Sequence, residues 1–363
     1  MVQITHSLTL LCSILLTLNL SFASAFVVPR SSCQSPRIRK EYGSLSTKEK
    51  KAYISAVKCL QSKPSKFPAG VVPGSKSRYD DFAAVHINQT TSIHLDGIFL
   101  GWHREFVWLW ETALIQECGY TGAQPYWDWP LWAHNLSSSP LFDGSDTSLG
   151  GDGYYDGSFD YYVVGVKPDG SLDTVPRGTG GGCVKSGPFK DVMVNLGPFE
   201  FTLVFTGLPS NWTAYNPHCL LRDLNQFCSE RTNQTYVDAA LATTTIADFQ
   251  NALSSATSRL GVHGNGHFAL GQSLQDFFAS PQDPAFFLHH GQIDRLWYQW
   301  QKKDLQARTY GNNALNGTST IFDPPTAPGV TFDTTMNWGI LGGTKSLGDV
   351  MSPTACGYCY QYQ

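Results

Sequence analysis

Six histidines in two clusters of three restrict the fold of this chain more than any other feature. The clusters are His86, His94 and His103, within VHINQTTSIHLDGIFLGWHREF, and His263, His267 and His290, within HGNGH and DPAFFLHHGQID. Neutral imidazole is a good ligand for copper, zinc, iron and nickel. Three protein ligands leave one position on a metal open for chemistry. Two triads in one domain therefore predict a pair of metals that share a substrate.

The spacing within the second cluster favours a helix. His263 and His267 are four residues apart, which places them about 40° apart around a helix axis and one turn apart along it. Both rings can then reach one ion, although Gly264 and Gly266 between them are poor helix formers. A zinc protease with the same spacing has a glutamate as general base directly after the first histidine. That position is Gly264, which argues against a peptidase.

The third member of the second cluster is predicted at the start of a helix from His290 to Lys303. Asp294 follows four residues later on the same face, and a carboxylate beside a ligating histidine usually fixes the orientation of its ring. We therefore expect Asp294 to orient His290, with a capping role or a pairing around Arg295 as the alternative. His289 is adjacent to His290 and is expected to point elsewhere, so one of the two would bind metal while the other packs or supports the ligands.

The first cluster does not suit a single straight helix. His86 and His94 are eight residues apart, which leaves them about 80° apart around an ideal helix and two turns apart along it. We expect His86 near the end of a helix over residues 80–88 and His94 in the loop that follows. His103 is expected to open a helix that runs to Cys118. Two helices and a loop would then converge on one ion.

Composition indicates a single aromatic-rich domain. The 363 residues are 42% hydrophobic and 15% charged, enough for one large core, and the net charge of −4 provides no basic patch for nucleic acid. Aromatic residues make up 13% and include ten tryptophans, which predicts an aromatic core or pocket. Further helices are expected at 46–60 and 245–260, and loops with one hairpin at 143–190. No linker divides the chain, so residues 26–363 are predicted to form one mainly α catalytic domain.

The N-terminus has the features of a signal peptide over residues 1–25. Residues 8–22 are mostly apolar, and Ala23-Ser24-Ala25 is a cleavage site of small residues. A membrane anchor is the alternative, but the apolar run is short for a bilayer span. We therefore expect a soluble, secreted protein that does not bind membranes and is a monomer or a weak homodimer.

Cysteines and glycosylation sequons agree with export. Removal of Cys12 with the signal peptide leaves eight cysteines, which predicts up to four disulfides without fixing their pairing. Cys356 and Cys359 form a CxxC, for which a structural bridge is favoured over a redox or zinc role. N-glycans are expected on sequons at Asn88, Asn135, Asn211, Asn233 and Asn316.

Five segments resemble motifs of the tyrosinase and catechol oxidase family of type 3 copper proteins, and the match covers most of the chain. They are Trp102-His103-Arg104 with Phe106, Pro125-Tyr126-Trp127-Asp128-Trp129, His263-Gly264-Asn265-Gly266-His267, Asp283-Pro284-Ala285-Phe286-Phe287 with His290 and Asp294, and Tyr358-Cys359-Tyr360. Arg37 or Arg39 occupies the place of the family's N-terminal arginine.

The resemblance implies a four-helix bundle around a binuclear copper site, with long loops and minor β structure. Each copper would have three histidine ligands, and His290 rather than His289 would be the third ligand of the second copper. With O2 as co-substrate, such a site oxidises o-diphenols to o-quinones. Phe277 falls where the family places a residue over the copper face, with core packing beside Phe278 as the alternative. Phe268 is expected to line the pocket mouth.

Three departures from the family pattern affect the expected activity. Ser92 stands where many relatives have a cysteine that forms a thioether with the second ligand, so no such crosslink is expected. The chain ends soon after Tyr360, which predicts no covering domain and no proteolytic activation. Gly264 replaces an asparagine that, with an upstream glutamate, helps tyrosinases to deprotonate monophenols. No acidic residue occurs between Asp248 and Asp276, so monophenol activity is expected to be low.

These patterns predict a secreted copper oxidase for small phenols, chiefly o-diphenols, with o-aminophenols as further candidates. One alternative is a tyrosinase with substantial monophenol hydroxylase activity. A remote alternative is an O2 carrier similar to haemocyanin, but such carriers are usually units of long repeated chains. A secreted binding module without metal is disfavoured because all six histidines are present.

Overall fold

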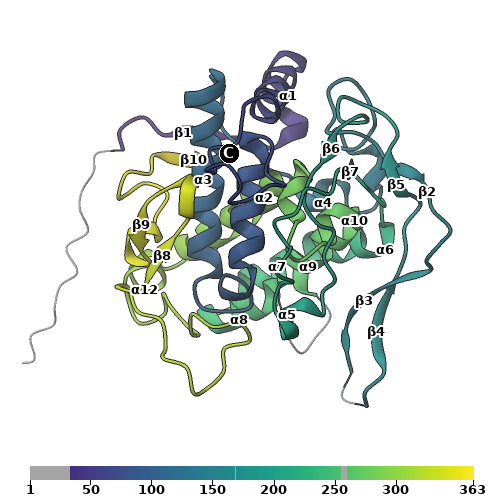
Figure 1. The fold of residues 1–363 in the computed structure, drawn as a ribbon. Helices are drawn as coiled ribbons and strands as arrows, with labels where there is room; N and C mark the ends of the chain where they lie inside the picture. Colours follow the sequence, from purple (N-terminus) through teal and green to yellow (C-terminus); the bar gives the residue numbers. More distant parts are fainter. Residues whose placement is uncertain (1–32, 168, 255–259) are drawn as a thin grey trace, which may run out of the picture.

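A computed structural model describes residues 33–167, 169–254 and 260–363. Four helices form the centre of the molecule (Figure 1), and they are α2 (Arg78–Gln89), α3 (Phe99–Cys118), α9 (Gly261–Leu270) and α11 (Ala285–Lys302). Helix α11 packs against both α3 and α9. The prediction of a mainly α fold built on a four-helix bundle is therefore confirmed. The predicted signal peptide lies outside the described residues.

Capping residues explain where two of the early helices begin. In α1 (Thr47–Ser62) the Ser46 side chain accepts a hydrogen bond from the backbone of Glu49, whose carboxylate accepts from the Ser46 backbone. Ser77 and Asp80 form the same reciprocal arrangement at the start of α2. Each arrangement satisfies amide groups that the first helical turn leaves without partners. The helix predicted over residues 46–60 is confirmed, and it ends at Ser62.

Two predicted helix starts are wrong by about one turn. Helix α3 begins at Phe99 and not at His103, and α11 begins at Ala285 and not at His290. Neither helix has a side-chain cap at its N-cap residue, and the carboxylates of Asp96 and Asp283, which come earlier, accept from the amides of Ile98 and Ala285 instead. Both histidines therefore lie in the second turn of a helix, where neighbouring turns fix the direction of the side chain.

Short helices and two-stranded sheets surround the bundle. The remaining helices are α4 (Trp129–Trp132), α5 (Leu203–Thr206), α6 (Gln226–Ser229), α7 (Gln234–Ala242), α8 (Ile246–Leu253), α10 (Gln272–Gln275) and α12 (Leu305–Thr309). The paired strands are β1 (Arg37–Arg39) with β10 (Tyr360–Tyr362), β2 (Gly153–Tyr155) with β5 (Gly181–Val184), β3 (Tyr161–Val166) with β4 (Leu172–Pro176), β6 (Met193–Val194) with β7 (His218–Cys219), and β8 (Thr335–Asn337) with β9 (Thr344–Ser346).

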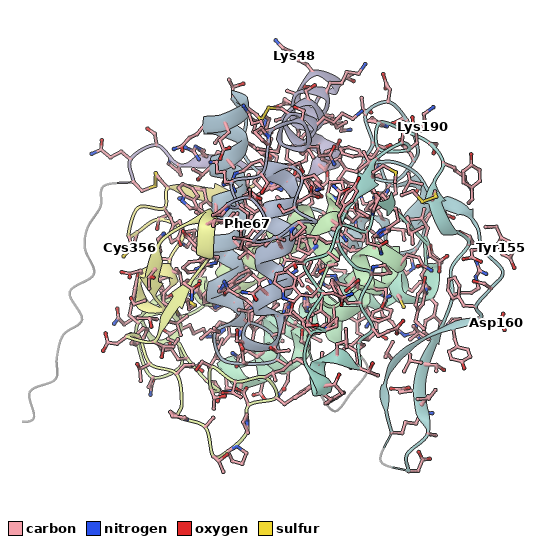
Figure 2. The ribbon with its side chains drawn as sticks, in the orientation of Figure 1. Lys48, Phe67, Tyr155, Asp160, Lys190 and Cys356 are labelled. Carbon is pink, nitrogen blue, oxygen red and sulfur yellow. A yellow bond between two sulfur atoms is a disulfide. The ribbon has the colours of Figure 1, made fainter. Side chains whose placement is uncertain are left out.

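The segment 143–190 contains more strand than the single hairpin predicted from its sequence. The β3–β4 hairpin extends beyond the helical core (Figure 1), and β2 pairs with β5 beside it. Tyr155 projects from the outer side of this region, as Figure 2 shows, and 74% of its surface is exposed. On the inner side, the Tyr162 hydroxyl donates to Asp223 and its ring packs against Phe268 of α9. This segment therefore lies against a helix that carries two of the clustered histidines.

The core between the helices is aromatic, as the composition predicts. The rings of Trp110 on α3 and Phe287 on α11 stack with centroids 3.6 Å apart, and Phe82 of α2 meets both edge-on. Trp102 stacks on Phe106 one turn further along α3. Such rings bury large apolar areas and adopt preferred geometries. The aromatic packing fixes α2, α3 and α11 relative to one another.

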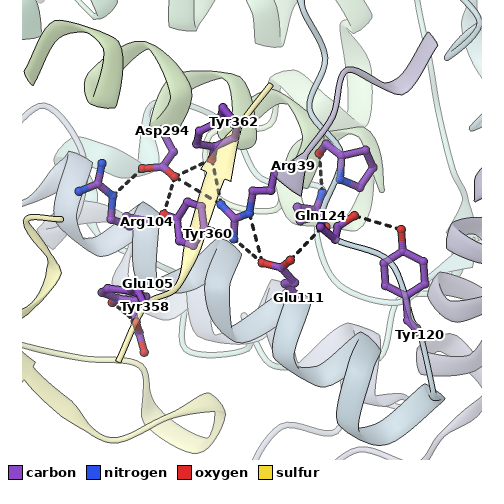
Figure 3. A network of polar contacts seen from close by, with 12 residues as sticks. Arg39, Arg104, Glu105, Glu111, Tyr120, Gln124, Asp294, Tyr358, Tyr360 and Tyr362 are labelled. Atoms are coloured by element: carbon purple, nitrogen blue, oxygen red, sulfur yellow. Dashed lines mark hydrogen bonds and ion pairs between the residues drawn. The ribbon is translucent and has the colours of Figure 1, made fainter. Parts of the chain in front are cut away.

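A buried polar network joins the two ends of the described chain (Figure 3). Strand β1 pairs in parallel with β10, and the Arg39 guanidinium on β1 donates to Glu111 of α3 and to Asp294 of α11. The hydroxyl groups of Tyr360 and Tyr362 on β10 donate to the Asp294 carboxylate, each at 2.6 Å. Of the two arginines considered from the sequence, Arg39 is the buried one, whereas Arg37 is exposed.

Three disulfides fasten the periphery among the described residues. They are Cys33–Cys359, Cys59–Cys118 and Cys183–Cys219. Cys359 thus bridges to the N-terminal segment, and the other member of the CxxC, Cys356, is a free thiol, as is Cys228. Four bridges were the upper limit predicted from the sequence. Among the helices described, none has the length and apolar character that crossing a bilayer requires.

Candidate metal centre

The first triad converges from two helices and one loop, as its spacing predicts. His86 lies on α2, His103 lies on α3, and His94 lies in the connection between these helices. The ring centroids are 4.9 Å apart for His86 and His94, 4.9 Å for His94 and His103, and 5.8 Å for His86 and His103. All three side chains are buried. Their ligand atoms are close enough together to bind one ion.

Backbone carbonyls orient all three rings in the same way. The Nδ1 atoms of His86, His94 and His103 bond to the carbonyl oxygens of Phe278, Thr90 and Phe99 respectively, at 2.7–2.9 Å. A carbonyl accepts only, so each Nδ1 carries the proton and each Nε2 presents a lone pair. The Nε2 atoms of His86 and His103 are buried without a hydrogen-bond partner. Buried ring nitrogens without partners that point at one another fit a metal ion.

The second cluster is built on α9 in the same manner. His263 and His267 lie one turn apart on this helix, as predicted, and their Nε2 atoms are 3.0 Å apart. The His267 Nδ1 donates to the carbonyl of Leu274 at 2.7 Å. The His263 Nδ1 is 2.7 Å from the Ser254 hydroxyl. Both Nε2 atoms therefore face the same space.

Both His289 and His290 lie beside this pair, so the expectation that one of them points elsewhere is wrong. The His289 ring stacks on His263 and packs against Trp129, on the outer side of the cluster. A side-chain carbon at Gly266 would collide with the His289 ring, which explains the glycine within α9. His290 instead stacks on His103 of the first triad, with ring centroids 4.5 Å apart. His290 is the residue that lies between the two clusters.

The two triads face each other across a narrow aromatic enclosure. The Phe99 ring lies 4.6 Å from His103 and 4.8 Å from His263, and the Phe286 ring lies 4.1 Å from His290 and 5.3 Å from His86. These rings give the space between the triads an apolar lining. The arrangement can hold two ions close enough for both to contact one small molecule.

Burial keeps the clustered histidines neutral. It lowers the pKa of His94 to about 3 and that of His267 to about 4. Burial together with the neighbouring histidines holds the pKa of His86, His103 and His290 well below 6.5. Metal ligation requires neutral imidazole. The ligand atoms are therefore in the required protonation state over the whole physiological pH range.

Asp294 does not make the contact predicted for it. Its carboxylate accepts from Arg104 at 2.5 Å and from Arg39 at 3.3 Å, whereas neither ring nitrogen of His290 has a hydrogen-bond partner in the described structure. Burial raises the pKa of Asp294, but the two guanidinium groups outweigh it and the pKa is lowered overall. Two buried cations compete for this short side chain more effectively than a neutral imidazole does. Asp294 anchors α11 and contacts the arginines instead of His290.

Three further predicted residues lie around the histidines. The half-buried Phe277 ring is 4.7 Å from His94, and Phe278 rather than Phe277 occupies the core. Phe268 is half-buried and packs against the β3–β4 hairpin. At Gly264, a Cβ atom would lie 2.9 Å from the Leu260 Cβ, so a larger side chain requires Leu260 to move.

Two residues that contact the histidines directly were not predicted from the sequence. Ser254 bonds to His263, and Phe99 packs between the triads. Ser254 carries no sequence signal because its contact depends on how α8 meets α9. Phe99 precedes His103 by four residues, so the correct start of α3 would have placed both side chains on one face.

Comparison with known proteins identifies relatives along nearly the whole chain. The family model "Common central domain of tyrosinase" matches residues 76–303. Tyrosinase P of Aspergillus terreus is 49% identical over 339 residues, which cover 92% of this chain and 94% of that protein. The N-acetyl-6-hydroxytryptophan oxidase of Emericella nidulans is 41% identical over 376 residues, which cover 99% of this chain and 100% of that protein.

A solved structure shares the fold. A single-residue variant of the polyphenol oxidase from Thermothelomyces thermophila matches with a TM-score of 0.84 and 41% sequence identity. The match covers 90% of this chain and 89% of that chain. Both helices of the first triad and both helices of the second cluster lie within the range matched by the family model.

Proposed function

We propose that this chain, which belongs to the tyrosinase family of binuclear copper oxidoreductases, oxidises o-diphenols to o-quinones with O2 as oxidant. We further propose His86, His94 and His103 as ligands of one copper ion, and His263, His267 and His290 as ligands of the other. The observation that carries the ligand assignment is the stacking of His290 on His103, because it brings the two triads face to face. Copper bound there supplies the electron transfer between the diphenol and O2.

The protein's own contribution to this reaction is placement and protection. Backbone carbonyls hold the imidazole rings so that their Nε2 atoms converge. Phe99 and Phe286 give the space between the triads an apolar lining, which strengthens electrostatic interactions within the site. Phe277, half-buried beside His94, is proposed as the residue that the diphenol ring meets on entry, and Phe268 as part of the pocket wall.

We propose low activity on monophenols because a base is missing at the expected place. A monophenol must lose its phenolic proton before it is hydroxylated. The seven clustered histidines are proposed to bind metal or to pack against the ligands, so none of them is free to accept that proton. Gly264 offers no side chain that could hold a water molecule, and Leu260 crowds the space that one would need. The same neutral, open site is compatible with o-aminophenols.

Export is the second part of this proposal. Disulfides are typical of proteins in oxidising compartments, and three occur among the described residues. The signal-peptide pattern at residues 1–25 supports secretion. Asn88, Asn135, Asn211 and Asn316 are exposed and accessible to glycosylation, whereas the Asn233 side chain caps α7.

Oxygen consumption tests the proposed substrate class. The copper-loaded protein is given catechol, 2-aminophenol and phenol at matched concentrations, and O2 uptake is followed together with quinone absorbance. Turnover of the first two with little on phenol is expected. Brisk uptake on phenol without a lag would mean that another base serves the site, and the protein would then be a tyrosinase with monophenol activity.

A further inference from the structure

A row of four phenylalanine rings leads from the histidine centre to the protein surface. Phe277, which touches His94, meets Phe201 edge-on with ring centroids 5.3 Å apart. Phe201 meets Phe205 edge-on at 6.2 Å, and Phe205 stacks on Phe322 at 5.7 Å with the ring planes only 8° apart. These residues come from three separate segments of the chain. We call Phe201, Phe205 and Phe322 the outer aromatic row.

The outer aromatic row is unusually exposed for residues of its type. The exposed fractions are 37% for Phe201, 70% for Phe205 and 40% for Phe322. Single exposed apolar residues are common, but a contiguous group of large ones marks a surface that binds something. This group is continuous with Phe277, and therefore with the proposed entry to the histidine centre.

The local structure holds the row in place instead of letting it collapse inward. In α5, Val204 faces the core beside Phe278, which leaves Phe201 and Phe205 on the outside. The Asp276 carboxylate accepts hydrogen bonds from the backbone amides of Phe199 and Phe278. One buried side chain therefore ties the segment before Phe201 to the segment that carries Phe277.

The third member of the row is fixed to the loop that carries His94. The Phe322 amide donates to the carbonyl of Leu95 at 2.9 Å, and the Gly97 amide donates to Thr318 at 2.7 Å. Phe322 has a φ of 65°, a left-handed conformation that is costly for a bulky side chain. Such a conformation persists only where surrounding contacts impose it. Here those contacts direct the ring toward Phe205.

We propose that the outer aromatic row is a binding subsite for a second, neutral aromatic ring of the substrate. The diol ring would lie at the histidine centre, beside Phe277, while an aryl substituent on it packs against Phe201 and Phe205, the members of the row nearest to Phe277. Ring centroids spaced at 5–6 Å match the spacing at which aromatic rings pack. Glu200 precedes Phe201 and Asp323 follows Phe322 in the chain, and these acidic neighbours disfavour anionic substituents. This inference rests on the proposed function and deepens it by naming the class of phenol.

Substrate selectivity gives the first test. The kcat/KM for 3,4-dihydroxybiphenyl relative to catechol is compared between the native protein and the double variant Phe201→Ala, Phe205→Ala. Loss of two stacking partners is expected to lower this ratio about tenfold, mainly through KM. Phe227→Ala is the matched control, because Phe227 is also 37% exposed but packs on Arg231 elsewhere, and it should leave the ratio unchanged.

Binding without turnover separates this inference from the proposed function. Copper-loaded protein is titrated calorimetrically under nitrogen with 4-phenylphenol and with phenol, and the unfolding temperature of each variant confirms that it is folded. The native protein is expected to bind 4-phenylphenol more tightly than phenol. In the double variant, the ratio of the two dissociation constants is expected to fall about tenfold. The same affinity ratio in the native protein and the double variant would overturn the proposed subsite, even if the protein oxidises catechol. Failure to oxidise catechol with the preference intact would instead overturn the proposed function alone.

Discussion

At the scale of single residues, the direction of the imidazole ring is set by a hydrogen bond at Nδ1 for five of the seven clustered histidines. Four of the clustered histidines bond through Nδ1 to a backbone carbonyl, and His263 bonds to Ser254. Carbonyls on fixed helices and turns are rigid acceptors, so the ligand set is preorganised before metal arrives. The six histidines can be predicted as metal ligands from the sequence, because their spacing along the chain shows which of them can share an ion. The sequence does not predict Ser254 or the outer aromatic row, since these contacts form between distant segments.

The two adjacent histidines on α11 provide the sharpest test at this scale. His290→Ala should lower the copper content from about two ions to about one per chain and abolish O2 uptake on catechol, because the second ion loses one of three ligands. His289→Asn is the control and should keep both ions. Metal analysis beside O2 uptake measures both effects. Full copper and full turnover in His290→Ala would show that His289 is the ligand.

Phe277 supports a second prediction at the residue scale. Its half-buried ring lies against His94, so replacement by alanine should widen the entry. We expect Phe277→Ala to raise kcat/KM for 4-tert-butylcatechol relative to catechol several-fold, since removing a phenyl ring opens space for a bulky group. Steady-state kinetics on both catechols measures the ratio. An unchanged ratio and unchanged KM values would mean that Phe277 does not control entry.

At the scale of elements, the histidine centre depends on how the chain ends are fastened to the bundle. Strands β1 and β10 deliver Arg39, Tyr360 and Tyr362 to the Asp294 carboxylate on α11 (Figure 3). The helices themselves follow from apolar spacing and caps in the sequence. Their starts at Phe99 and Ala285 do not, because neither N-cap side chain makes a capping bond. The parallel pairing of β1 with β10 joins segments too distant for local patterns to reveal.

The Arg39 network predicts a large effect on stability. Arg39→Ala would leave Glu111 buried without its cationic partner, and breaking a buried ion pair in this way costs about 3–5 kcal/mol of unfolding free energy. Arg37→Ala, two residues away on the exposed side of β1, should cost little. Urea unfolding of both variants measures the difference. Equal stability of the two variants would contradict a structural role for this network.

At the scale of the whole molecule, the buried histidines make metal-free protein sensitive to acid. Seven described histidines have a lowered pKa, and they are His86, His94, His103, His263, His267, His289 and His290. In the unfolded chain they titrate near 6.5, so below that pH the unfolded state takes up protons that the folded state refuses. The free energy of unfolding therefore has its full value above pH 6.5. It declines as the pH falls toward 3–4, the range of the pKa values of His94 and His267 in the folded protein.

The urea concentration at the midpoint of unfolding, measured at several pH values, reports this decline. Each such histidine contributes a loss of roughly 1 kcal/mol per pH unit within that window. Four buried carboxyls with raised pKa act in the opposite direction, and they are Asp80, Asp96, Glu105 and Asp276. The histidines outnumber them, so the midpoint of metal-free protein should be clearly lower at pH 5 than at pH 7. Bound copper should reduce the difference, and a pH-independent midpoint would contradict the burial of neutral histidines.

The proposed mechanism requires two triads that hold two copper ions, and both ions act on one substrate. The most direct measurement is catechol turnover during stepwise addition of copper to metal-free protein, with bound copper determined at each step. We expect activity to reach its plateau at two ions per chain and protein with a single ion to be inactive. A plateau at one ion per chain would contradict this mechanism, because one triad alone would then suffice for the reaction.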